Sequence, residues 1–70
     1  MNKAKLRGKM REQGVTQEVL AKNLGVALST LNRKLQGDDS GDSFSVAEAN
    51  QIIKILGLSV DDAVSIFFAE

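Results

Sequence analysis

This chain of 70 residues contains no cysteine, no histidine and no proline. Without cysteine there is no disulfide framework, which fits a reducing compartment, and we expect a cytoplasmic protein. Zinc sites depend mostly on cysteine and histidine, and histidine is the usual proton carrier near neutral pH. We therefore expect no enzyme, no catalytic residue, no cofactor, no metal and no small-molecule ligand.

Aromatic residues are few: the chain has three phenylalanines and neither tryptophan nor tyrosine. Its core must therefore be aliphatic. The apolar runs are far shorter than the roughly 18 residues that a membrane span needs, and the basic N-terminal segment lacks the apolar region of a secretory signal. The absence of proline, together with six scattered glycines, favours a bundle of short helices.

The net charge of zero conceals an asymmetry along the chain. Residues 1–37 carry eight basic and two acidic side chains, a net charge of +6, whereas residues 38–70 carry one basic and seven acidic ones, a net charge of −6. A basic half is what nucleic-acid binding on one side of a domain requires. The alternative is that the two halves neutralise each other.

Glycines at positions 14, 25, 37 and 57 each follow a segment with helical periodicity and are expected to end a helix in the left-handed conformation. Thr16 can cap the start of one helix, and Ser45 with Glu48 has the form of a capping box. The pair Ser59 and Asp62 repeats this form more weakly. These signals predict five helices, at about residues 3–13, 17–23, 28–36, 46–56 and 60–68.

Helical periodicity also predicts which side chains form the core. They are Leu6 and Met10 in the first helix, Leu20, Ala21 and Leu24 in the second, Leu31 and Leu35 in the third, whose apolar stripe Leu28 extends, and Ala49, Ile52, Ile53 and Leu56 in the fourth. In the third helix, 100° per residue places Ser29, Asn32, Arg33 and Gln36 on the face opposite the leucines. Arginine, asparagine and serine are suited to contact base edges, although an ordinary solvated face favours the same residues.

Only residues 24–27 separate the second and third helices, so the two must cross steeply, with Ala21 where their backbones approach. This is the arrangement of a helix-turn-helix, whose second helix enters the major groove of DNA.

The residues at these positions resemble the lambda-repressor-like family of helix-turn-helix proteins, also called XRE-type. The matching positions are Thr16-Gln17-Glu18, Leu20-Ala21, Leu24-Gly25-Val26, Ser29-Thr30-Leu31 and Gly37. The flanking segments STLNRKLQG, Phe44-Ser45 and IIKILGLSVDDAVSIFF are similar to short phage-encoded regulators made of this domain alone. The resemblance implies an all-α fold, a compact bundle of five short helices in a single domain of residues 1–70, with the helix-turn-helix at about 16–37.

The resemblance also implies roles for individual residues. Gln17, at the start of the second helix, corresponds to a glutamine that holds a DNA phosphate. Leu28, Ser29 and Arg33 occupy base-facing positions of the recognition helix, and Asn32 lies beside them. The remaining candidates for phosphate contacts are Thr30, Lys34 and Gln36.

Three features depart from the family pattern. Ala27 stands where the family usually has a serine or threonine cap, which predicts a frayed start of the third helix. Leu28 replaces a polar residue, and it either meets a thymine methyl group or folds back onto the leucine stripe. Asp38, Asp39 and Asp42 replace basic residues and would oppose a phosphate backbone unless their loop turns away.

The C-terminal segment places bulky side chains on more than one helix face. Either Val64 and one or both of Phe67 and Phe68 close the core over the first and fourth helices, or Phe67 or Phe68 joins a two-fold dimer contact.

These observations predict a transcriptional regulator, of the phage repressor type, that binds double-stranded DNA as a homodimer and has no membrane association. The alternative is a protein-interaction module of the same fold, like an antitoxin or antirepressor, with little DNA binding. The acidic C-terminal half and Leu28 favour this alternative.

Overall fold

A computed structural model describes residues 2–36 and 44–68 of the chain. This part is helical and contains no strand, which confirms the predicted all-α bundle of five short helices. The helices are α1 (Lys3–Gln13), α2 (Gln17–Leu24), α3 (Leu28–Leu35), α4 (Val46–Leu56) and α5 (Val60–Ala63), and α5 continues directly into a π-helical segment, η1 (Val64–Phe68). The predictions for Gly37, Asp38, Asp39 and Asp42 lie outside the described residues.

The predicted helix starts are confirmed by the caps. Thr16 accepts a hydrogen bond from the amide of Val19, and Ser59 accepts one from the amide of Asp62. Ser45 and Glu48 form the full capping box, in which each side chain accepts from the other residue's amide. Ala27 makes no side-chain cap, as predicted, so α3 begins without one.

Three helices end in the same way, at a glycine in the left-handed conformation. In α2, Gly25 has φ 71°, and the amide of Val26 donates to the carbonyl of Ala21 at 3.1 Å. A hydrogen bond between an amide and the carbonyl five residues before it is characteristic of the Schellman motif. Glycine allows this motif because it has no Cβ. The third helix ends one residue earlier than predicted, because Gln36 takes an extended conformation.

The core is aliphatic and draws on α1 to α4 and on η1. Its buried members are Leu6, Met10, Leu20, Ala21, Leu31, Leu35, Ile52, Leu56 and Ile66. Ala49 is also buried, and Leu24 packs against the core from its margin, as predicted. Two predictions for α4 and η1 need correction: Ile55 rather than Ile53 packs against the core cluster, and Ile66 rather than Val64 is buried.

The C-terminal segment η1 is wound as a π-helix and buries Ile66, which lies three residues after the buried Ala63. Ile66 is fully buried, and its carbonyl accepts a hydrogen bond of 2.6 Å from the amide of Asn2. Phe67 packs at the margin of the core, whereas Val64 and Phe68 are exposed. Of Val64, Phe67 and Phe68, which were predicted to close the core, only Phe67 packs against it.

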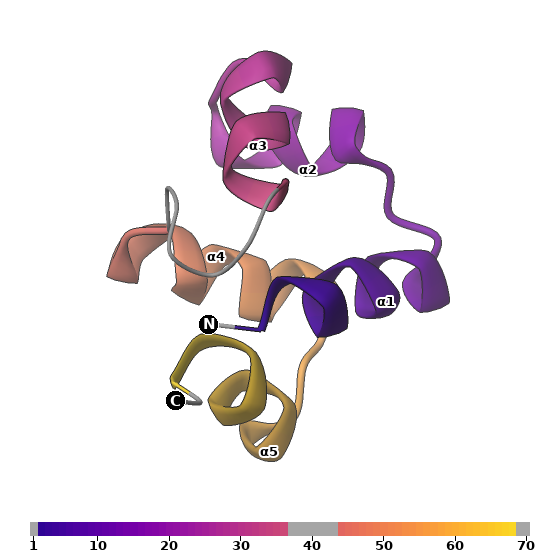
Figure 1. The fold of residues 1–70 in the computed structure, drawn as a ribbon, viewed down its shortest axis with the longest axis vertical. Coiled ribbons are helices and arrows are strands. Elements are labelled where there is room, and N and C mark those ends of the chain that lie inside the picture. Colours follow the sequence, from indigo (N-terminus) through magenta and orange to yellow (C-terminus); the bar gives the residue numbers. More distant parts are fainter. Residues whose placement is uncertain (1, 37–43, 69–70) are drawn as a thin grey trace.

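The helices are arranged in three levels (Figure 1). α2 and α3 pack against each other at one end, α1 and α4 lie in the middle, and α5 with η1 lies at the other end. α2 packs on α4, and η1 packs on α1. No helix in residues 2–36 or 44–68 has the length and apolar character needed to cross a bilayer.

Replacing Ala27 by serine should supply the missing cap of α3, because Ala27 already has the extended backbone of a capping residue (φ −67°, ψ 147°). We expect the free energy of unfolding to rise by about 1 kcal/mol, measured by urea denaturation followed by far-UV circular dichroism. The matched control is Thr16→Ala, which removes the cap of α2 and should lower stability by a similar amount. Unchanged stability of Ala27→Ser would contradict this account.

Candidate nucleic-acid interface

α3 presents a polar face outward because its leucines at positions 31 and 35 point inward. Leu31 and Leu35 are completely buried. On the opposite side, Ser29 and Arg33 are exposed and Asn32 is partly exposed. The side chain of Gln36 donates a hydrogen bond of 3.4 Å to Asn32, which extends this face to the end of the helix. The structure therefore brings together the polar residues that the sequence analysis selected for base contact.

Leu28 lies at the exposed beginning of α3. Its side chain is 41% exposed and is not part of the core, so the prediction that it joins the leucine stripe is wrong. Leu28 is the first residue of α3, and Leu31 and Leu35 alone supply the buried leucines of this helix. Of the two alternatives from the sequence, the one that leaves Leu28 available to a ligand fits the structure.

The C-terminal end of α3 is bound by two cationic side chains of α1. Arg7 donates a hydrogen bond to the carbonyl of Leu35, and Lys3 donates one of 3.4 Å to the carbonyl of Gln36. The last carbonyls of a helix lack partners within the helix and carry partial negative charge, so cations stabilise them. Lys3 is 2% exposed, and the sequence analysis did not anticipate its burial. These contacts attach α3 to α1 at one end.

Lys34 attaches the same helix to α4. Its ammonium group lies 2.8 and 3.0 Å from the two carboxylate oxygens of Glu48 and 5.7 Å from the centre of the Phe44 ring. The hydrogen bond from Lys34, followed by that from the Ser45 amide, lowers the pKa of Glu48. The structure thus gives Lys34 an ion-pair partner within the protein, and its phosphate contact stays a prediction.

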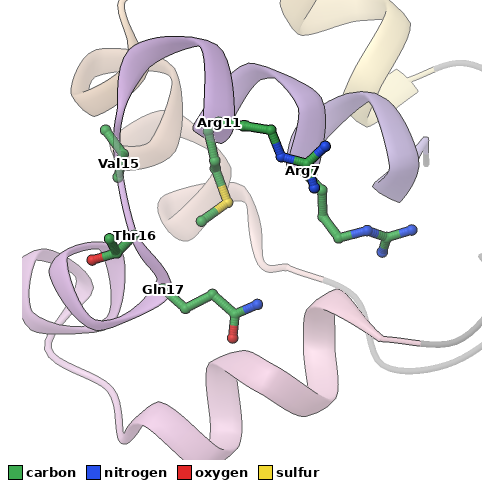
Figure 2. Close-up of a pocket in the computed structure, with 6 residues that line it drawn as sticks. Arg7, Arg11, Val15, Thr16 and Gln17 are labelled. Atoms are coloured by element: carbon green, nitrogen blue, oxygen red, sulfur yellow. The ribbon is translucent and has the colours of Figure 1, made fainter.

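A groove of about 270 Å³ lies between α1 and the start of α2. Its lining residues are Arg7, Met10, Arg11, Val15, Thr16 and Gln17. In Figure 2, Gln17 extends from the start of α2 into the space between α1 and α3, and the side chains of Arg7 and Arg11 lie along the α1 side of it. Because Arg7 also binds the last turn of α3, the groove adjoins that helix. Two guanidinium groups and an amide therefore surround one open space beside α3.

Arg7 and Arg11 were missed as site residues, although the sequence contained a signal for them. Lys3, Arg7 and Arg11 recur every four residues, so they lie on one face of α1. Lys5 and Lys9 form a second basic row on another face. The two rows separate in the structure: the first meets the end of α3 and the groove, and the second meets α5.

The second row is paired with acidic residues. Lys9 lies 3.1 Å and Lys5 3.6 Å from the Asp62 carboxylate, and Lys9 also lies 3.6 Å from Glu12. The hydrogen bond between Lys9 and Asp62 raises the pKa of Lys9 and lowers that of Asp62. Together with Lys34 and Glu48, these pairs show that part of the charge asymmetry is neutralised between the two halves of the chain. The groove beside α3 is lined instead by arginines of the first row.

The remaining predicted residues lie in different places. Gln17 is partly buried in the groove, Thr30 is partly buried on α3, and Gln36 is exposed. Val64 and Phe68 belong to η1, at the end of the molecule opposite α2 and α3 (Figure 1). The proposed dimer residues therefore form a surface separate from the face of α3.

Within residues 2–36 and 44–68, no three side chains of the histidine, cysteine, aspartate or glutamate type are grouped so as to hold a metal ion. Comparisons of the chain with protein-family models, with curated proteins and with solved structures found no match. The case for a function therefore depends on the residues described above.

Glu48→Gln should test the attachment of α3 to α4. Glutamine keeps the acceptor of the capping box but removes the charge that binds Lys34. Because the folded protein lowers the pKa of Glu48, the stabilisation is complete above the usual glutamate value of 4.5 and is lost as the pH falls through the folded value. We expect the variant to be about 1 kcal/mol less stable at pH 7.

This difference from the parent should vanish in acid, below the titration of Glu48, as measured by urea denaturation at several pH values. Comparing the two proteins at each pH removes the contribution of Asp62, which titrates in both. A difference that persists unchanged at low pH would show that the effect does not come from the charge of Glu48.

Proposed function

We propose that this protein binds double-stranded DNA sequence-specifically and regulates transcription, with α3 in the major groove. The observation that carries the proposal is the polar outward face of α3 directly beside a groove lined by Arg7, Arg11 and Gln17. An α-helix fits the major groove, and basic groups beside it are needed for the adjacent phosphates. With its side chains an α-helix is about 10–12 Å in diameter, close to the width of that groove.

The geometry of α2 and α3 supports a helix-turn-helix of the lambda-repressor-like type. α2 packs against α3, Gly25 turns the chain between them, and Ala21 is 4% exposed. A small side chain at this position allows the two helices to approach closely. In this motif the second helix contacts base edges with its N-terminal residues, while the first crosses the DNA backbone.

The residues of α3 then divide into two roles. Arg33 can donate two hydrogen bonds to a guanine and Asn32 can pair with an adenine, while Ser29 is able to donate or accept. Gln17 and Arg11 in the groove hold a phosphate, and Arg7 combines a phosphate contact with its bond to Leu35. Phosphate contacts provide affinity and fix orientation, whereas base contacts distinguish one sequence from another.

One α3 helix covers only about half of a regulatory site, so we propose that two copies bind to half-sites one helical turn apart. The surface that suits a contact with a second copy is the apolar row Val60, Val64 and Phe68, which are 79%, 49% and 66% exposed. In a π-helix each residue turns through less than the 100° of an α-helix. The winding of η1 therefore keeps Phe68 closer to the line of Val60 and Val64 than an α-helix would.

The same apolar row favours a second candidate function, a module that binds a partner protein and little DNA. The internal pairing of Lys5, Lys9 and Lys34 also favours it, because these charges are directed at carboxylates of the same chain. The dependence of binding affinity on salt concentration distinguishes the two candidate functions. Affinity for DNA should fall by orders of magnitude between about 50 and 200 mM salt, whereas an apolar protein contact should be nearly unaffected.

Arg33→Ala should abolish discrimination at one guanine of the bound sequence while the fold remains intact, because Arg33 lies on the exposed face of α3. We expect the free energy of binding to the preferred site to weaken by about 1–3 kcal/mol, and that of binding to other sequences to weaken much less. The preferred site is first selected from a random DNA pool, and affinities are then measured by fluorescence anisotropy.

Arg11→Ala is the matched control for this experiment, since it removes an equal charge from the groove and none from α3. It should weaken binding to all sequences alike. The slope of the logarithm of affinity against the logarithm of salt concentration should become shallower by about 1. The same sequence preference in Arg33→Ala and the parent would refute the role of Arg33. A pool that yields no preferred sequence would refute the proposed function as a whole.

Phe68→Ala should weaken binding to a two-fold symmetric site by about tenfold, because it truncates the largest exposed apolar side chain of the row. Binding to a single half-site should not change. Val19→Ala, which truncates an exposed valine on α2, serves as the control and should leave the cooperativity between half-sites intact. Equal affinities of Phe68→Ala and the parent for the symmetric site would exclude this surface.

A further inference from the structure

The first residue of α3 is an exposed leucine on the side of the helix that the proposed function directs at DNA. Leu28 is 41% exposed, whereas Leu31 and Leu35 are completely buried. It therefore contributes little to the core, and the fold does not account for a large apolar side chain at this position.

The neighbours of Leu28 place it at the edge of the base-contacting face. Asn32 follows it by four residues, so the two lie next to each other on the helix surface, and Ser29 adjoins them. Ala27 precedes it with only a methyl group, and its side chain caps nothing. The N-terminal end of α3, which contacts base edges in a helix-turn-helix, thus begins with an apolar surface.

Among the groups that base edges present in the major groove, only the methyl group at C5 of a pyrimidine is apolar and can pack against such a side chain. Guanine presents two acceptors, adenine an acceptor and a donor, and unmodified cytosine a donor, whereas thymine adds a methyl group at C5. A leucine packed on a donor or acceptor would remove it from water without a replacement, which is unfavourable. Packing on a methyl group removes apolar surface of both partners from water, which is favourable.

We propose that Leu28 contacts the 5-methyl group of a pyrimidine, so that the preferred DNA half-site contains a 5-methylpyrimidine near the base bound by Ser29 or Asn32. This inference rests on the proposed function. Two bases carry this methyl group, thymine and 5-methylcytosine. If the second is the source, binding depends on the methylation state of the DNA.

The expected size of the effect follows from the burial of one methyl group. At about 0.8 kcal/mol for such a group, its loss corresponds to about a fourfold decrease in affinity per half-site. The effect is confined to the one position that Leu28 reaches. All hydrogen-bonding groups of the base are retained when thymine is replaced by uracil.

The experiment uses a half-site selected from a random pool, in which each thymine in turn is replaced by deoxyuridine and each cytosine in turn by 5-methylcytosine. Affinities of the parent, Leu28→Ala and Arg33→Ala are measured at one salt concentration, with far-UV circular dichroism as a check of folding. Because Leu28 is largely outside the core, Leu28→Ala should remain folded.

We expect the parent to lose about fourfold in affinity at one thymine-to-uracil position, and Leu28→Ala to bind thymine and uracil alike there. A gain at one 5-methylcytosine, again absent from Leu28→Ala, would identify that base as the source. Arg33→Ala should retain the methyl effect, since it leaves Leu28 in place.

Two results would overturn the proposal, and they are distinguishable. If no methyl group at any position affects the parent while Arg33→Ala still loses its guanine preference, the assignment of Leu28 fails and DNA recognition by α3 stands. If Leu28→Ala responds to the methyl group as strongly as the parent does, the assignment of Leu28 likewise fails while DNA recognition by α3 stands. If no sequence is selected at all, the proposed function and this inference fail together.

Discussion

The position of α3 depends on two cationic side chains that α1 directs at its last carbonyl groups. Lys3 is almost completely buried and binds Gln36, and Arg7 binds Leu35. Burying an ammonium group is unfavourable unless a partner compensates, so the end of α3 must lie where these carbonyls reach Lys3. With Lys34 bound to Glu48 as well, α3 is attached to both α1 and α4. Its outward face is oriented by these attachments and by the two buried leucines.

The positive charge of α1 is divided between structure and surface by helical periodicity alone. Lys5 and Lys9, on one face of α1, pair with Asp62 on α5. The other row, Lys3, Arg7 and Arg11, reaches the end of α3 and the groove that Gln17 also lines. The net charge of zero therefore says little about the field beside α3, because the field at a site depends on where charges lie. A chain that is neutral as a whole can still present two arginines to an anion.

Local features of the fold were predictable from sequence because their partners are close along the chain. The caps at Thr16, Ser45 and Ser59 bind amides three residues away, and a glycine determines its turn by its own conformation. The outward polar face of α3 followed from periodicity in the same way. The roles of Lys3 and Lys34 did not, because their partners are 33 and 14 residues distant and become neighbours only on folding.

Other errors concern which apolar side chains become covered. Val64 was expected to close the core, whereas Ile66 is the buried residue of η1. Periodicity also placed Leu28 on the apolar stripe of Leu31 and Leu35, although its side chain is exposed. Periodicity states which side of a helix is apolar, but it does not state how far along that side the neighbouring helix reaches.

The hydrogen bond from the Asn2 amide to the Ile66 carbonyl has a consequence for the path of the chain. It brings the first and last described turns within 2.6 Å at those two atoms, so the backbone is nearly a closed ring. A short peptide that joined these two described turns would cost little chain entropy, because the turns already lie together. The described part of the fold is therefore suited to circular permutation, in which these turns are linked and the chain is opened at another surface turn.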